Sequence, residues 1–256
     1  MQIAQPSATE TANELELIRQ HLNLDGTTIL ELGCGKAQLT RAIAQNFSVH
    51  KIIATEVDTI QHEVNLASEH PNNIEFRAGG AQAIALPDNS VDIVFMFKSL
   101  HHVPVELMPL AFQEIERVLK PQGSLWISEP VYAGAFNELL RLFHDEQKVR
   151  EAAFQHTQAA VDSGLLQLKQ QIFFNAVTHF VDFAEFEQRI IGVTHTKHVL
   201  SPELATQVEM AFNQQMGKDG ATFLTPQRFD WLKKAVKEKI PPLSNHSTDR
   251  INALSN

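Results

Sequence analysis

The sequence contains very little cysteine, since Cys34 is the only one among 256 residues. A single thiol excludes a disulfide framework and any metal site built from several thiolates. Long apolar runs are also missing, because no stretch approaches the roughly 18 apolar residues that cross a membrane. Residues 1–14 are polar and lack the apolar core of a secretory signal. We therefore expect a soluble, cytoplasmic protein.

Positive charge is scarce as well. The chain has 21 Lys and Arg against 30 Asp and Glu, a net charge of −9. This balance disfavours a DNA or RNA substrate. Hydrophobic residues make up 43% of the chain, which is enough for one sizeable core. We expect one domain over residues 1–240 and a polar, flexible tail over 241–256. The sequence does not decide the oligomeric state, so a homo-oligomer stays open.

The most informative stretch is ILELGCGKAQLT at residues 29–40. Apolar residues lead to Glu31, then to Gly33 and Gly35, and a helical pattern follows. Glycine suits a tight turn or a place where a ligand approaches the backbone closely. The next helix begins with free N–H groups and the positive end of its dipole. The pattern predicts a nucleotide-type binding corner at the carboxyl end of a parallel strand.

Strands alternate with helices in the first half of the chain. After an amphipathic helix at 14–22, we predict strands at 27–32, 51–55, 74–78, 91–97 and 124–128, with helices at 37–45, 60–69 and 106–118. Such alternation predicts a parallel sheet in an α/β fold.

The pattern changes after residue 130. Consecutive helices are expected at 135–149 and 151–168, forming a helical lid over about 133–170 above the carboxyl edge of the sheet. Ser201 followed by Pro202 predicts a helix start, with serine as the cap and proline at the first position. The other expected elements are a strand at 173–181, a helix at 183–190, a strand beginning at 221–225 and a terminal helix at 228–239.

An acid, Glu56, follows the second predicted strand, about 20 positions beyond the glycine turn. A carboxylate at this place can accept hydrogen bonds from both hydroxyls of a ribose. Two plainer interpretations stay open: Glu56 as a solvated acid, and the glycine pair as a purely structural turn.

Four motifs in order, ELGCGKA, TEVD, GGAQAIALPDNSVDIVFMFKSLHHV and EIERVLKPQGSLWISEP, resemble the class I S-adenosylmethionine-dependent methyltransferases. They are most similar to the small-molecule branch that includes the ubiquinone and menaquinone C-methyltransferases. The resemblance covers about residues 25–130 and, weakly, 172–235. It implies S-adenosyl-L-methionine as cofactor and a Rossmann-like, doubly wound seven-stranded sheet whose last strand is antiparallel.

The resemblance also implies a set of cofactor-binding residues: Glu31, Gly33, Cys34, Gly35, Glu56, Val57, Gly80, Ala81, Gln82 and Lys98. Glu31 and the turn would lie beside the methionine part, Glu56 at the ribose and Val57 at the adenine. The sequence departs from the family at two positions. Ala37 stands at the third glycine, and Gly80 stands where an acid usually contacts the adenine amino group, which leaves the Ala81 backbone and Gln82 to replace that acid.

Methyl transfer from a sulfonium is an in-line displacement, for which the protein mainly supplies orientation and exclusion of water. A base is needed only if the acceptor loses a proton. His101 and His102 fall where the resemblance places the transferred methyl group, and imidazole titrates near pH ~6.5. Their alternative role is structural or substrate-shaping. Lys98, Glu129 and Tyr132 lie at predicted strand ends where acceptor groups could reach them, and His144 and Asp145 in the predicted lid are weaker candidates.

Twelve histidines, including His195 and His198, invite a metal hypothesis, but no HExxH or paired-cysteine spacing accompanies them, so we predict no metal site. We predict a methyltransferase that acts on a small-molecule acceptor. The alternative is a non-catalytic S-adenosylmethionine or S-adenosylhomocysteine-binding accessory or sensor protein, which the missing acid at Gly80 favours. A nicotinamide-dependent oxidoreductase fits poorly, because Leu39 or Thr40 stands where a further glycine would fall.

Overall fold

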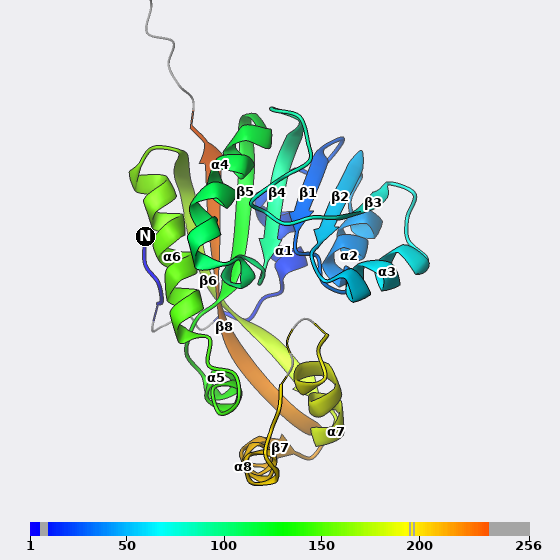
Figure 1. The fold of residues 1–256 in the computed structure, drawn as a ribbon, viewed down its shortest axis with the longest axis vertical. Coiled ribbons are helices and arrows are strands. Elements are labelled where there is room, and N and C mark those ends of the chain that lie inside the picture. The colour runs from blue at the N-terminus through cyan, green and yellow to red at the C-terminus, as the bar shows by residue number, and fades with distance from the viewer. Residues whose placement is uncertain (6–9, 195, 197, 236–256) are drawn as a thin grey trace, which may run out of the picture.

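The computed structural model describes residues 1–5, 10–194, 196 and 198–235, which form one large mixed sheet with helices on both faces (Figure 1). The strand order is β3-β2-β1-β4-β5-β8-β6, and β7 pairs with β8. The strands are β1 Thr28–Leu32, β2 Lys51–Glu56, β3 Ile74–Ala78, β4 Val91–Phe97, β5 Leu119–Pro130, β6 Leu166–Phe180, β7 Met216–Gly217 and β8 Gly220–Lys234. The first five are parallel, whereas β8 is antiparallel to both β5 and β6. The predicted fold class is confirmed, with the two-residue β7 as an addition.

The α-helices are α1 Glu14–His21, α2 Gln38–Asn46, α3 Thr59–Ala67, α4 Met108–Val118, α5 Ala135–Leu140, α6 Gln147–Asp162, α7 Phe183–Phe186 and α8 Pro202–Asn213. The 3-10 helices are η1 Leu100–His102 and η2 Val105–Leu107, and η3 Glu187–Ile191 is a π-helix. Side-chain caps fix several starts. The predicted Ser201 cap is present, because its side chain accepts from the N–H of Leu204. Among the described residues, no helix combines the length and the apolar character that a membrane span requires.

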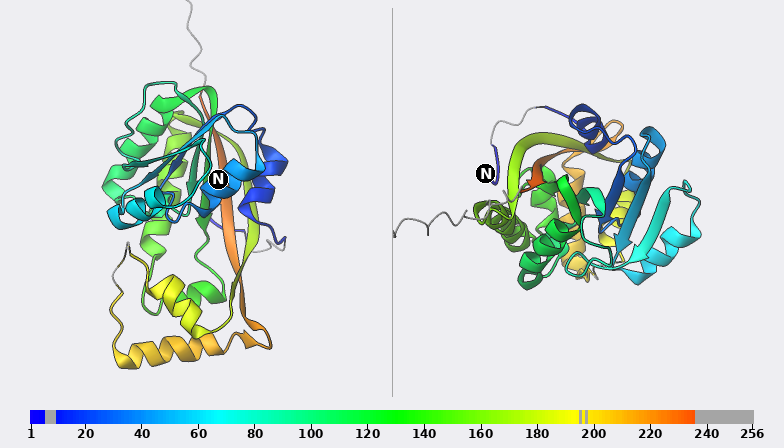
Figure 2. Two further views of the ribbon diagram at one scale, coloured as in Figure 1. Left: turned by 90° about the vertical axis from the view of Figure 1, so that its right-hand side faces the viewer. Right: turned by 90° about the horizontal axis from the view of Figure 1, so that it is seen from above.

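Two apolar layers hold the helices on the sheet. On one face, α4 and α6 pack against Leu30 of β1 and its neighbours on β4 and β5. On the other face, α1 and α2 pack against Ile29 of β1. Figure 2 shows α4 and α6 on one side of the sheet and α1 on the other. Successive residues of a strand point to opposite faces, so strands buried on both faces read as continuous apolar runs.

The region predicted as a lid divides into two parts. Only α5 lies beyond the carboxyl edge of the sheet, whereas α6 packs beside α4 (Figure 1). The reason is the one-sided burial of α6, whose inward positions Arg150, Ala153, Thr157 and Ala160 recur at helical spacing. Strand β6 then begins at Leu166, inside the segment predicted to be helical.

The terminal helix predicted at 228–239 is wrong, because β8 continues to Lys234. Its residues pair on both sides, for example Trp231 with Trp126 of β5 and with Gln170 of β6. Phe229 and Asp230 point to opposite faces of β8 and are both buried, so the sequence lacks the alternation that would identify a strand. Residues 236–239 and the predicted flexible tail at 241–256 lie outside the described residues.

Strands β6 and β8 run on past the rest of the sheet. Pairing of β5 with β8 ends at Pro130 and Gln227, whereas pairing of β6 with β8 continues to Phe180 and Ala221. We call this extension, together with α5, α7 and α8, the cap; it lies on the side of the carboxyl ends of the parallel strands (Figures 1 and 2). Its own apolar core consists of Leu139, Phe180, Phe186, Val208, Phe212, Ala221 and Phe223.

Candidate active site

The turn after β1 has the geometry that its glycines predict. Gly33 and Gly35 adopt left-handed backbone angles, with φ of 73° and 52°. A Cβ on Gly33 would lie 2.7 Å from the Cβ of Ser99, whereas nothing lies within 4 Å of a Cβ on Gly35. Gly33 is therefore required by packing, and Gly35 leaves open space at the turn. Ala37, at the third glycine position, is also left-handed with φ of 53°, a conformation that costs roughly 1–2 kcal/mol for an L-residue.

Two buried carboxylates flank this turn. Glu31 accepts a hydrogen bond from the Thr40 hydroxyl at 2.6 Å, and burial raises its pKa to about 7. Glu56 accepts from three backbone N–H groups: Gly35 at 2.6 Å, Val57 at 2.8 Å and Asp58 at 3.0 Å. In the described part of the chain, neither carboxylate forms an ion pair. The pair suits a ligand that carries both a positive charge and hydroxyl groups.

A cavity of about 410 Å³ opens beside the turn. Its lining comprises Glu14, Glu31, Gly33, Cys34, Lys36, Gln38, Leu39, Ala42, Phe97 and Lys98. Lys98 forms a 2.8 Å ion pair with Glu14, which draws α1 to the carboxyl end of β4. Glu14 escapes notice in the sequence because it resembles any acid at the start of an amphipathic helix. Cys34 is buried, and burial raises the pKa of its thiol, which fits a packed residue better than a nucleophile.

The departure at Gly80 has a structural counterpart. A Cβ on Gly80 would lie 2.5 Å from Oε1 of Gln82, so the Gln82 amide occupies the space of a side chain at position 80. Ala81 between them is buried. Val57, at the end of the neighbouring strand, is 67% exposed and offers an apolar surface there. The arrangement fits Gln82 as the replacement for the absent acid.

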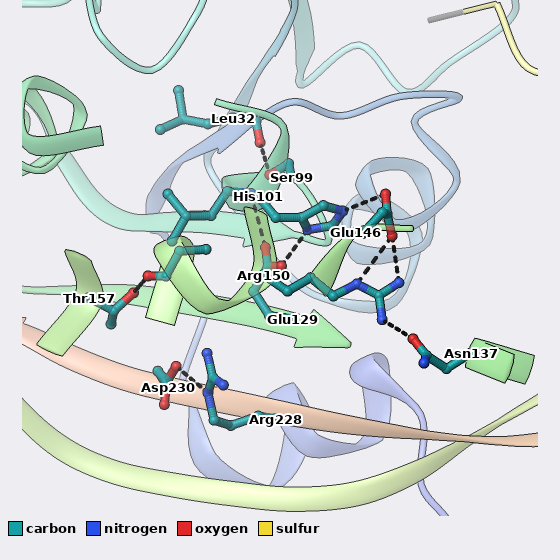
Figure 3. A network of polar contacts seen from close by, with 12 residues as sticks. Leu32, Ser99, His101, Glu129, Asn137, Glu146, Arg150, Thr157, Arg228 and Asp230 are labelled. Atoms are coloured by element: carbon teal, nitrogen blue, oxygen red, sulfur yellow. Dashed lines mark hydrogen bonds and ion pairs between the residues drawn. The ribbon is translucent and has the colours of Figure 1, made fainter. Parts of the chain in front are cut away.

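The predicted histidines lie at the end of β4. His101 is buried, with Nδ1 hydrogen-bonded to Glu129 and Nε2 3.6 Å from Oε1 of Glu146 (Figure 3). Burial by itself lowers the pKa of His101, but Glu129 and Glu146 outweigh it and raise this pKa to about 9. The two carboxylates thus favour the protonated form of His101, which makes this side chain a poor candidate for a base. His102 is exposed, with its ring centroid 4.1 Å from that of His101, and is the better candidate for a base.

A chain of charged groups continues from His101 into α6. Glu146 binds Arg150 at 2.5 Å, and Arg150 donates to Oδ1 of Asn137 on α5 at 3.1 Å. Figure 3 shows this line of side chains running from β5 to the cap. No local motif marks Glu146 or Arg150, because only the packing of α6 brings them to the end of β4.

The weaker sequence candidates separate in space. His144 joins the cluster, with Nε2 3.0 Å from Oε1 of Glu146. Tyr132 donates instead to Asp145 at 3.0 Å in an exposed pair. His195 lies outside the described residues. Of these candidates, Glu129 and His144 thus lie in the cluster around His101 and Glu146. Tyr132 and Asp145 pair with each other instead.

Comparison with known proteins identifies the domain. A family described as "Methyltransferase domain" matches residues 30–127. Residues 30–127 belong to the methyltransferase domain family. The predicted resemblance to the class I S-adenosylmethionine-dependent methyltransferases is confirmed for these residues, and the matched domain implies S-adenosyl-L-methionine as its cofactor.

Among curated relatives, an uncharacterized methyltransferase of Schizosaccharomyces pombe is 31% identical over 160 residues, which cover 61% of each chain. A demethylmenaquinone methyltransferase of Staphylococcus haemolyticus is 32% identical over 115 residues, covering 42% of this chain and 47% of that protein. The chain thus spans less than two thirds of the length of these relatives.

Solved structures show the same fold. A putative methyltransferase from Bacillus halodurans has a TM-score of 0.62 at 15% identity, over 88% of this chain and all of that one. The [4+2]-cyclase SpnF has a TM-score of 0.56 at 19% identity, covering 87% and 80% of the two chains. Because one of these proteins is described as a cyclase, the fold alone does not fix the chemistry.

Proposed function

We propose that the protein is an S-adenosylmethionine-dependent methyltransferase that transfers a methyl group to a small-molecule acceptor, with residues 1–240 as a single domain. The observation that carries the proposal is the pair of buried carboxylates, Glu31 and Glu56, at an open glycine turn beside a cavity of about 410 Å³. This arrangement lies within a methyltransferase domain. When bound, the cofactor supplies an electrophilic methyl group.

The residues of the turn fit that cofactor. Three backbone N–H groups donate to Glu56 and hold its carboxylate at the end of β2, where it can accept hydrogen bonds from ribose hydroxyls. The charge of Glu31 complements a sulfonium or ammonium group, because an adjacent cation favours the ionised carboxylate. Val57 and Gln82 offer an apolar surface and an amide for the adenine.

The acceptor side is formed by η1 and the cap. His102 would take a proton from an acceptor that must lose one, while Glu129 orients the neighbouring His101. The cap lies on the same side as this edge and would limit the access of water to a bound acceptor. Several relatives are methyltransferases of quinone biosynthesis, which supports a small, largely apolar acceptor. Most cap phenylalanines are buried in the core of the cap and do not line an acceptor pocket.

The first experiment is calorimetric titration with S-adenosylmethionine and S-adenosylhomocysteine. We expect micromolar affinity, about −8 kcal/mol. Glu56→Ala should weaken binding about 10- to 100-fold, because it removes a charged acceptor of hydrogen bonds. Glu63→Ala, at an exposed acid on α3, serves as the matched control and should bind like the wild type.

Turnover is then measured by mass spectrometry with phenol, quinol and amine acceptors. A product heavier by one methyl group supports the enzyme. Tight cofactor binding without any product would favour the accessory or sensor alternative. Absence of binding by the folded wild-type protein would overturn the proposal.

A further inference from the structure

A cluster of metal-binding side chains forms where η1 meets the start of α6. One ligand atom each from His101, His102 and Glu146 lies within 4.8 Å of the other two. Glu146 directs Oε1 toward this point, 3.6 Å from Nε2 of His101 and 3.0 Å from Nε2 of His144. Two imidazoles and a carboxylate are ligands that divalent transition metals prefer in proteins.

The groups behind these side chains are arranged as in the outer shell of a metal site. Glu129 binds Nδ1 of His101, which directs Nε2 of the same ring toward Glu146 (Figure 3). Glu129 is itself fixed by the N–H of Leu100 at 3.0 Å. Arg150 holds the opposite oxygen, Oε2, of Glu146. Carboxylates behind a histidine and partners behind a ligating carboxylate orient ligands for metal binding.

We propose that His101, His102 and Glu146 bind a divalent transition-metal ion of the Zn²⁺ class. Tetrahedral bonds of about 2.0–2.2 Å place ligand atoms about 3.4 Å apart, so the three ligand atoms must move closer together when the ion binds. A metal ion binds the neutral form of imidazole, so the ion would replace the proton of His101 Nε2 beside Glu146. Sequence spacing conceals the site, because Glu146 comes from a helix far along the chain.

Three protein ligands leave a position open on the metal. An oxygen donor of the acceptor, such as a phenol or a carboxylate, would fill it, and this part of the inference rests on the proposed function. The binding of the ion itself does not, because no ligand belongs to the glycine turn.

The test is calorimetric titration of untagged, metal-stripped protein with ZnCl₂ in the absence of S-adenosylmethionine. We expect one equivalent to bind at micromolar or lower Kd. His102→Ala and Glu146→Gln should each weaken binding at least tenfold. His50→Ala is the control, because this exposed histidine lies before β2, at the opposite end of the sheet, and its loss should leave the affinity unchanged.

Circular dichroism verifies that each variant is folded, and His102→Ala is informative by itself because its side chain is exposed. Wild-type protein that binds no stoichiometric Zn²⁺, or His102→Ala that binds it equally well, would overturn the inference. Loss of S-adenosylmethionine binding with Zn²⁺ binding retained would contradict the proposed function alone.

Discussion

At the scale of single residues, the site depends on acids removed from water. Glu31 is only 2% exposed, and its nearest polar partner is the hydroxyl of Thr40. Burial disfavours the charged form of a carboxyl group, and the nearby charge of Glu56 acts in the same direction. The protein therefore keeps an acid where an apolar or amide residue would be more stable. Retention of such a group is typical of a binding site.

The pKa of about 7 makes a prediction for stability. The unfolded chain releases the Glu31 proton near its ordinary pKa of 4.5, whereas the folded protein retains it to about pH 7. Stability from this group is present below pH 4.5 and is lost as pH rises to about 7. Glu31→Gln should remove this loss, on the order of 3 kcal/mol.

Urea unfolding of wild type and Glu31→Gln at several pH values between 5 and 8 measures the difference. Glu63→Gln, at an exposed acid, is the control and should follow the wild type. Parallel stability curves for wild type and Glu31→Gln would show that the Glu31 carboxyl titrates normally.

At the scale of elements, the turn after β1 and the loop after β4 are packed into one another. Ser99 donates to the carbonyl of Leu32 at 2.6 Å, and its Cβ occupies the space that a side chain at Gly33 would need. The same loop continues into η1, which carries both candidate histidines. A side chain at position 33 should therefore displace Ser99 and, with it, the histidines of η1.

Gly33→Ala should destabilise the protein by about 2–5 kcal/mol, the sum of a left-handed alanine and a clash with Ser99. Gly26→Ala is a matched control, because Gly26 has φ of 66° but open space around its Cβ position. It should cost only about 1–2 kcal/mol. Thermal or urea unfolding of both variants measures these losses of stability. Equal losses in the two variants would mean that the clash with Ser99 does not destabilise Gly33→Ala.

At the scale of the whole molecule, the protein has two apolar centres: the layers on the sheet and the separate core of the cap. The cofactor residues sit on the sheet, whereas Asn137, at the end of the charged chain, belongs to the cap. The two parts are joined by the strands β6 and β8 and by the bond from Arg150 to Asn137. Changes in the cap should therefore affect the acceptor side more than the cofactor side.

Phe212→Ala tests this division, because Phe212 is fully buried among the cap phenylalanines. Removal of a buried phenyl ring costs about 3–5 kcal/mol. We expect faster proteolytic cleavage within the cap but S-adenosylmethionine affinity within about threefold of wild type. Met210→Ala on the same helix is the control, since Met210 is 63% exposed. A loss of cofactor affinity as large as the loss of cap stability would contradict this separation.

The sequence by itself determined the features that depend on neighbouring residues. Local patterns predict the strand, glycine turn and helix around Gly33 and Gly35, the acid Glu56 at the end of β2, and the parallel direction of the first five strands. Left-handed glycines and alternating strands and helices have few structural alternatives.

Only the tertiary structure decided what depends on distant pairs. Strand β8 runs through the segment predicted as a terminal helix, because β8 pairs with both β5 and β6. The tertiary structure also brought Glu146 and Arg150 to His101, and Glu14 to Lys98. These contacts join residues far apart in the sequence, so neither periodicity nor motif spacing predicts them. They stabilise the protein only after the chain has folded.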